Sequence, residues 1–154
     1  GEEKGPQDIL DEAYCNTVAS RECIITIAQH YGIEARNVQG EVAGNISKST
    51  VQALIEKYMN EGWLIGGSGS NNNGITAHSS TNENPYSKGG HYVGYYGLNA
   101  DGRWWIADPA SKNGNWNKEG TDRRFLIDPN KNDFIQHGII RDDKTDLNIA
   151  IFRK

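Results

Sequence analysis

The chain has little that would tie it to a membrane or to nucleic acid. Its longest apolar run, residues 23–28, contains a threonine and is far shorter than the roughly 20 residues that cross a bilayer. Sixteen lysines and arginines stand against twenty acidic residues, a net charge of −4, with no basic block. This charge pattern argues against nucleic acid as a partner. We therefore expect a chain that binds neither a membrane nor nucleic acid.

Cysteine and metal-ligand patterns are also scarce. Cys15 and Cys23 are the only cysteines, too few for a disulfide framework, and we expect two free thiols. The four histidines do not combine with them at a metal-ligand spacing, so we expect no metal and no other cofactor. Residues 1–6 lack the apolar segment of a signal peptide and are typical of a linker or a cloning remnant. Localisation stays open on this basis, including secretion or delivery to a cell wall.

Length and periodicity predict one α+β domain over residues 1–154, expected to be a monomer. Apolar residues at helical spacing predict helices over 20–31 and 47–62, ended by Gly32 and Gly62, the second capped by Ser47 or Ser49. Strand patterns follow at 63–67, 89–97, 103–109, 124–129, 134–140 and 147–152, and the last two are expected at sheet edges. Helices followed by antiparallel strands predict a site where the helical part packs on the sheet.

One predicted hairpin brings an imidazole near a carboxylate. The letters G-G-H-Y-V-G-Y-Y-G and R-W-W-I-A-D-P flank a turn, and a two-residue loop at Ala100-Asp101 makes Val93 face Asp108. His91 then lies diagonal to Asp108 on one face, within side-chain reach. A loop at Asp101-Gly102 keeps both residues on one face but further apart, and a three-residue loop puts them on opposite faces of the sheet. A His–Asp pair of this kind can orient a general base, whereas the plainer alternative is a solvated surface hairpin.

A base needs a nucleophile, and the start of the first helix is the place to look for one. Unpaired N–H groups and the helix dipole lower thiol pKa values there. Ala19 occupies that position. Cys23 falls one turn inside the helix on its apolar face, where a small buried side chain is the expected role, and Cys15 lies in the polar lead-in.

A resemblance to a known family joins these features. The segment A-S-R-E-C-I-I-T-I-A-Q-H-Y-G resembles the C-G-x-A-C-L-x-M-x-x-x-Y-Y-G helix of papain-like cysteine peptidases that remove double-glycine leaders from bacteriocins, and of their stand-alone relatives. The segments G-H-Y-V-G-Y-Y-G and W-W-I-A-D-P-A look like that family's G-H-F-V-V-L-Y and V-x-I-x-D-P-A. The likeness covers roughly half of the chain in two blocks.

The resemblance implies a papain-like fold and a set of site residues. Ala19 stands where the family has its catalytic cysteine, with His91 as base and Asp108 as its orienting carboxylate. Ser20 replaces the family's glycine, and Ala13 stands where bacteriocin-processing members have the oxyanion-stabilising glutamine. Stand-alone relatives space this glutamine further upstream, which makes Gln7 our choice. Asp128, in a second Asp-Pro, is the weaker candidate for the carboxylate because no direct hairpin joins it to His91.

Two classes of function follow. An alanine methyl cannot attack a carbonyl, so the chain is either a cysteine peptidase or amidase silenced by a Cys-to-Ala change or a natural module that binds peptides without cutting them. The intact His91 and Asp108 favour the silenced enzyme. Its expected substrate is a peptide or peptidoglycan-type wall peptide, and a leader peptide is the alternative. A third possibility makes Cys15 the nucleophile.

Two further features bear on substrate binding. Residues 66–90 are rich in Ser, Asn and Gly, and they fit either a mobile loop or a substrate-contact loop that leads into His91. Aromatic residues gather around the hairpin, and we expect one alternating set in the core and the other available to a peptide or glycan. The residues concerned are Tyr92, Tyr95, Tyr96, Trp104, Trp105 and Trp116.

Overall fold

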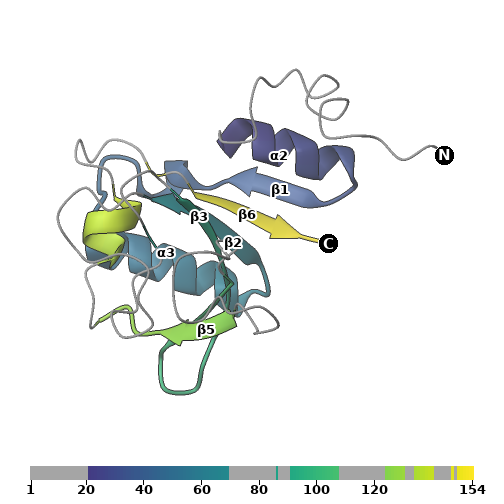
Figure 1. Cartoon of the computed structure of the whole chain (residues 1–154). Coiled ribbons are helices and arrows are strands. Elements are labelled where there is room, and N and C mark those ends of the chain that lie inside the picture. The colour runs from purple at the N-terminus through teal and green to yellow at the C-terminus, as the bar shows by residue number, and fades with distance from the viewer. Residues whose placement is uncertain are drawn as a thin grey trace.

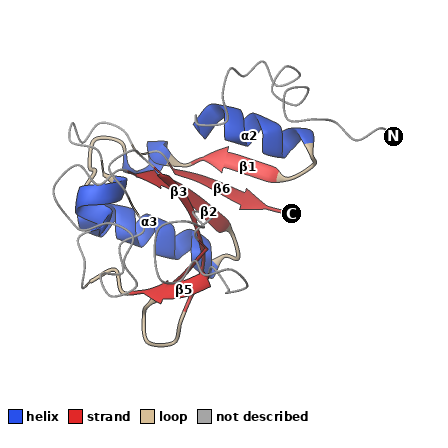
Figure 2. Cartoon of the chain, in the orientation of Figure 1, coloured by secondary structure: helices blue, strands red, loops and turns tan. Residues whose placement is uncertain are grey.

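The computed structural model of the chain describes residues 21–69, 86, 91–107, 124–130, 134–140, 147 and 149–154. The described residues form an α+β arrangement of helices and a six-stranded antiparallel sheet, as the sequence predicts (Figure 1; Figure 2). The helical elements are α2 (Arg21–His30), η1 (Gln39–Val42), α3 (Lys48–Asn60) and the π-helical η2 (Ile135–Ile139). The strands are β1 (Glu34–Asn37), β2 (Leu64–Gly69), β3 (His91–Leu98), β4 (Trp104–Ala107), β5 (Arg124–Ile127) and β6 (Ile149–Arg153).

The sheet has the strand order β1-β6-β2-β3-β4-β5, and every neighbouring pair is antiparallel. The last strand of the chain therefore lies between β1 and β2, and the expectation that it forms an edge is wrong. Its residues explain this position, because Ile149, Ala150 and Ile151 are all buried. An edge strand commonly carries charge to discourage further pairing, and this strand carries charge only at its end, in Arg153.

The main core lies between one face of the sheet and α3 with η2. Figure 1 shows α3 running along β2 and β3, and these elements are in direct contact. The sheet contributes Ile65, Val93, Tyr95, Trp104, Ile106, Ile127, Ile149 and Ile151, all at most 2% exposed. Phe134 packs edge-on against Trp104 and stacks on Tyr95, which closes the core below η2.

The sequence signals of α3 are confirmed in detail. Ser47 is the N-cap: its side chain accepts from the backbone N–H of Thr50, whose hydroxyl accepts in turn from the Ser47 N–H. The apolar residues that recur at helical spacing within 47–62 are the buried ones, namely Val51, Leu54, Ile55, Tyr58 and Met59. Gly62 follows the helix with φ +85°, a conformation that side chains disfavour.

The first helix is held differently. Gly32, with φ +75°, ends α2 as predicted, and the Ile33 N–H donates to the Ala28 carbonyl across the helix end. No residue of α2 is fully buried, however, so its apolar face is only partly covered. The helix packs on β1 and β6 (Figure 1). Near its end, the Gln29 side-chain amide donates to the Ala35 carbonyl of β1.

Two elements differ from the prediction. The strand β1 was not foreseen, because its letters E-A-R-N contain a single apolar residue, Ala35, which is its only buried one. Residues 135–139, expected as a strand, form the π-helical η2. Its buried Ile135 and Ile139 lie four residues apart, a spacing that places them on one face of a helix. A short apolar run of this kind fits a strand equally well, so the pattern does not distinguish the two.

Candidate functional site

Most of the predicted site residues lie outside the described part of the chain. Gln7, Ala19 and Asp108 are among the residues that the structure does not describe. His91 is described through its backbone, which opens β3 and pairs with Gly69 at the end of β2. The described residues therefore show the segments that flank the predicted site, which are the start of α2 and the end of the sheet where β2 ends and β3 begins. We call these segments the frame of the site.

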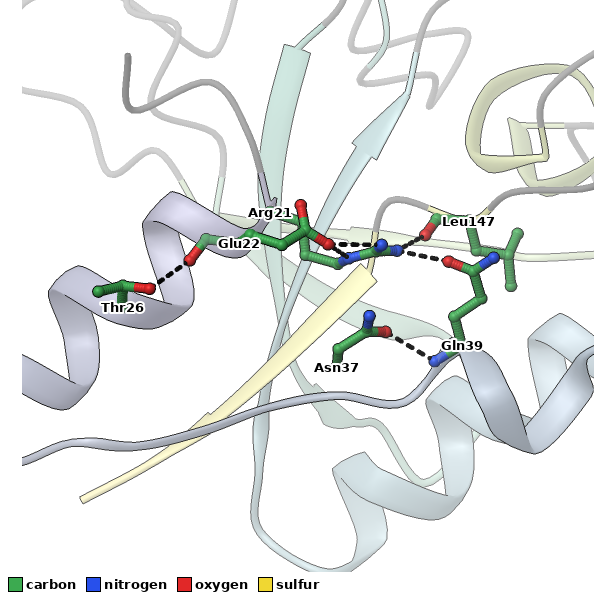
Figure 3. A network of polar contacts seen from close by, with 6 residues as sticks. All are labelled: Arg21, Glu22, Thr26, Asn37, Gln39 and Leu147. Atoms are coloured by element: carbon green, nitrogen blue, oxygen red, sulfur yellow. Dashed lines mark hydrogen bonds and ion pairs between the residues drawn. The ribbon is translucent and has the colours of Figure 1, made fainter. Parts of the chain in front are cut away.

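The start of α2 is fixed by the side chain of Arg21, two residues after Ala19 (Figure 3). Its Nη1 donates to the Gln39 side-chain oxygen of η1 at 2.6 Å and to the backbone carbonyl of Leu147. Its Nε and Nη2 donate to one carboxylate oxygen of Glu22 at 2.9 and 2.7 Å. The Arg21 side chain is only 13% exposed, so these contacts replace water around most of the guanidinium.

Glu22 and Gln39 are themselves held in place. The hydrogen bond from Arg21 keeps the pKa of the Glu22 carboxyl below its usual value, so this side chain stays negative in the first turn of the helix, where the helix dipole favours an anion. The Thr26 hydroxyl donates to the Glu22 carbonyl one turn on (Figure 3). The backbone N–H of Gln39 donates to the side-chain oxygen of Asn37 at 3.0 Å.

The register of the sheet shows where this arginine anchors the helix. Ile149 of β6 pairs with Gly67 of β2, which pairs with Val93 of β3. Two residues towards the same end of the sheet stand Leu147, Gly69 and His91. The Arg21 guanidinium therefore binds the chain at the end of the sheet where β3 begins. Two strand spacings, about 10 Å, separate β6 from β3.

Tyr86 anchors the chain just ahead of His91. It is fully buried, and its hydroxyl lies 2.6 Å from the Tyr95 hydroxyl and donates to the Gly67 carbonyl at 3.1 Å. Residues 70–85 and 87–90 are outside the described residues, so neither interpretation of the 66–90 segment is tested. A fixed point nevertheless exists within this segment, five residues before His91.

Glycines make the slot that holds the Tyr86 ring. A Cβ on Gly138 of η2 would lie 2.7 Å from Tyr86 Cδ2, and one on Gly69 would lie 2.9 Å from Tyr86 Cε1 and 2.6 Å from the Gly138 carbonyl oxygen. On Gly67 a Cβ would lie 3.2 Å from the tyrosine hydroxyl. The missing side chains let β2 and η2 close around the ring. The sequence pattern does not predict this slot, although Tyr86 is the one tyrosine in a run rich in Ser, Asn and Gly.

The hairpin has the predicted strand register, but its loop differs in length from the predicted one. Asn99 N–H donates to the Arg103 carbonyl and Gly102 has φ +87°, so the loop has three residues, Ala100 to Gly102, and the predicted two-residue loop is wrong. A β-bulge between Tyr95 and Gly97 then offsets the extra loop residue. Gly94 pairs with Ala107, the pairing that follows from Val93 facing Asp108. The described ladder ends there.

The alternative carboxylate has a structural role. Asp128 accepts a hydrogen bond from the Asn130 N–H at 2.9 Å, which makes a local turn after β5. This turn gives the second Asp-Pro a structural role.

The aromatic residues divide as expected where they are described. Tyr95 and Trp104 are buried and pack edge-on in the core. Tyr96 and Trp105 stack on the other face with ring centroids 6.3 Å apart, and Trp105 is 36% exposed. Trp116 lies outside the described residues.

The expectation of two free thiols is wrong. Cys23 is disulfide-bonded, and it is half-buried in the loosely packed α2 instead of being sealed in the core. Cys15 is the only other cysteine of the chain. A disulfide at Cys23 removes the free thiol that the Cys15 alternative requires, because there is no third cysteine.

Within the described residues, no three or more His, Cys, Asp or Glu side chains gather as metal ligands would. No helix in this part of the chain is long and apolar enough to cross a membrane.

Comparisons with known proteins add no relative: no protein-family model matches the chain, and no curated protein matches it.

Proposed function

We propose that this chain is a papain-like cysteine peptidase or amidase domain in which Ala19 occupies the place of the nucleophile. The observation that carries the proposal is the order and spacing of the two blocks, one at the first helix with Ala19 and one at the hairpin with His91 and Asp108. The frame of the sheet supports it, because Arg21, two residues after Ala19, is tied to the end of the sheet at which β3 begins with His91. In a papain-like enzyme the nucleophile and the base meet across such a junction.

The hairpin register gives a second line of support. With Gly94 opposite Ala107, a ladder continued by one residue in each strand would set Val93 opposite Asp108. The base at position 91 and the carboxylate at position 108 would then be diagonal neighbours, which is the spacing that a His–Asp pair needs.

In a parent with cysteine at position 19, the chemistry follows from these roles. His91 takes the thiol proton, Asp108 orients the ring and stabilises its charge, and the thiolate attacks the substrate carbonyl carbon. Gln7 and the backbone N–H of residue 19 stabilise the oxyanion. The amine leaves with the proton from the imidazolium, and water activated by His91 then hydrolyses the thioester. Alanine permits none of these bond changes, although peptide binding can remain.

The substrate that we propose is a wall peptide of the peptidoglycan type, because the chain is rich in Asn, Gly and aromatic residues, a composition that suits wall hydrolases. The exposed Tyr96–Trp105 stack supports contact with a peptide or a glycan. The second candidate, a binding module, is favoured by one observation, Ala19 itself.

The reversion Ala19→Cys tests the proposal. Cys23 is disulfide-bonded, so alkylation by iodoacetamide without reductant reports on the new thiol alone. Thr26→Cys supplies a matched thiol, since Thr26 is exposed on the same helix almost two turns further on. The proposal expects the Ala19→Cys thiol to react at neutral pH at least about 10-fold faster than the Thr26→Cys thiol, because it ionises below the ordinary value of about 8.5.

Hydrolysis separates the substrates. Ala19→Cys protein is expected to release new amino groups from purified peptidoglycan and to leave a double-glycine leader peptide intact. Cleavage of the leader peptide alone would replace the proposed wall-peptide substrate with a leader peptide and would leave the proposed peptidase activity in place. A thiol no faster than that of Thr26→Cys, together with no cleavage of either material, would favour the binding module.

A further inference from the structure

Arg21 joins parts of the molecule that are far apart in the sequence. Its side chain contacts Gln39, 18 residues on, and Leu147, 126 residues on. Figure 3 shows the guanidinium reaching from the first turn of α2 to both partners. Because most of its N–H groups donate hydrogen bonds to these partners and to Glu22, the Arg21 side chain fixes the position of its own backbone.

The rest of α2 is held by the disulfide at Cys23 and by partly buried packing on β1 and β6. None of its residues is fully buried, and its far end is held by the polar contact from Gln29 to the Ala35 carbonyl and by the turn at Gly32. Packing of an apolar face usually sets where a helix lies on a sheet, and in α2 this packing is only partial. Among the described non-covalent contacts of the first turn, those of Arg21 are the ones that reach η1 and the chain before β6, and they act beside the disulfide at Cys23.

Because Arg21 stands two residues after position 19, their Cα atoms are at most about 7 Å apart. A shift of the arginine is passed to residue 19 with little attenuation. Displacement of a reacting group by 1 Å can lower a rate by about 10²-fold. The anchor lies at the end of the sheet where β3 begins with His91, so it sets the separation of the two residues that must exchange a proton.

We propose that Arg21 is a positioning residue that places residue 19 against His91, an inference that rests on the proposed function. Its role is geometric, because Glu22 lies 2.7 Å from the guanidinium and offsets its charge. Arginine is suited to this role, since its planar fork directs donors to three acceptors at once, whereas lysine offers one compact ammonium group.

The test uses the Ala19→Cys protein and measures the pH profile of iodoacetamide alkylation. Arg21→Met and Arg21→Lys are each expected to slow alkylation at neutral pH at least about 10-fold and to move the apparent thiol pKa towards about 8.5. Gln39→Leu, which removes one partner, is expected to have a smaller effect in the same direction. A purely structural weakening would lower the melting temperature without moving the pH profile.

Arg153→Met is the matched control. Arg153 also pairs with a carboxylate, that of Glu34 at 3.0 Å, but it lies at the other end of β6. Its loss is expected to leave the thiol pH profile unchanged. Full rescue by Arg21→Lys would show that the charge matters and not the fork, and it would overturn the positioning role, as would an unchanged profile in Arg21→Met.

A second readout keeps this inference separate from the proposed function. In the chain with Ala19, hydrogen exchange of the amides of residues 22–24 is expected to accelerate in Arg21→Met more than exchange at residues 28–30. An inert thiol in Ala19→Cys combined with this exchange result would reject the peptidase and keep Arg21 as an anchor. Uniform or unchanged exchange would reject the anchor itself.

Discussion

At the scale of single residues, Tyr86 explains how a polar segment can be fixed to the sheet. Its ring is buried between Gly69 and Gly138, and its hydroxyl is satisfied by Tyr95 and Gly67. A large aromatic side chain buries much apolar surface, and its one polar atom needs a partner inside the protein. Both requirements are met here, which gives the chain a fixed point shortly before His91.

The slot predicts that Gly138→Ala destabilises the fold. The added methyl would stand 2.7 Å from Tyr86 Cδ2, and relief of such a clash costs about 1–3 kcal/mol in the free energy of unfolding. Urea denaturation measures this. Gly40→Ala is the control, because a Cβ there meets nothing within 4 Å and should change stability little. Equal effects of the two substitutions would contradict the slot.

Removal of the Tyr86 hydroxyl gives a separate prediction. Tyr86→Phe keeps the ring but withdraws the hydrogen bonds to Tyr95 and Gly67. Loss of a partner for buried polar groups costs about 1–3 kcal/mol, so the urea midpoint should fall. An unchanged midpoint would show that water replaces the hydroxyl and that the anchor is apolar only.

Glu41 gives a stability contribution that depends on pH. Its carboxylate accepts from the Tyr58 hydroxyl and from Lys57 Nζ at 3.0 Å, and the bond from Tyr58 keeps the pKa of Glu41 below its ordinary value of 4.5. Because the folded state has the lower pKa, this contribution is complete above 4.5 and is lost as the pH falls through the folded value.

The substitution Glu41→Gln should therefore lower the free energy of unfolding at neutral pH, by up to about 1 kcal/mol for a partly exposed pair. The difference from the parent should disappear well below pH 4.5, where both side chains are neutral. Urea denaturation at the two pH values measures it. A difference that is the same at both would mean that charge has no part in the contact.

At the scale of elements, the sequence predicts most where local signals agree. The capping residue, apolar spacing and terminal glycine of α3 all point to one helix, and all three are found. The sequence predicts least where pairing with a distant segment decides the secondary structure. The four letters of β1 become a strand only because β6 pairs with them, and the apolar run before Ile140 becomes η2 because it packs over β2 and α3.

The hairpin shows how two local errors can cancel. The sequence predicts a two-residue loop, but Gly102 adds a third residue, and the bulge at Tyr96 restores the pairing of Gly94 with Ala107. A bulge leaves no clear mark in an alternating pattern of tyrosines and glycines, so the sequence alone could not locate it.

The loop predicts the effect of Gly102→Ala. With φ +87° the new side chain would be strained, at a cost of roughly 1–2 kcal/mol, and the melting temperature should fall. Gly97→Ala is the control, because the φ of Gly97 lies outside the left-handed region and the nearest atom to a Cβ is 4.0 Å away. A two-residue loop would need positive φ at Ala100 and Asp101 instead, and Gly102→Ala would then be tolerated.

At the scale of the whole molecule, two anchors that are remote in sequence meet at one end of the sheet. Arg21 binds Leu147 there, and Tyr86 packs against Gly69, the partner of His91. The sequence motifs predict the candidate site residues. They do not predict either anchor, because the contacts of Arg21 and Tyr86 are made with partners that only folding brings near. The candidate site itself is a prediction from the sequence letters of His91, Asp108 and Ala19, and of these only the backbone of His91 is among the described residues.

The most direct test of the account measures the thiol pKa of Ala19→Cys with and without His91. From the pH dependence of iodoacetamide alkylation, we expect an apparent pKa at least about two units below the ordinary 8.5 when His91 is present, and a return towards 8.5 in Ala19→Cys with His91→Ala. A thiol that titrates near 8.5 in both proteins would mean that residue 19 and the imidazole do not meet, and the peptidase proposal would be wrong.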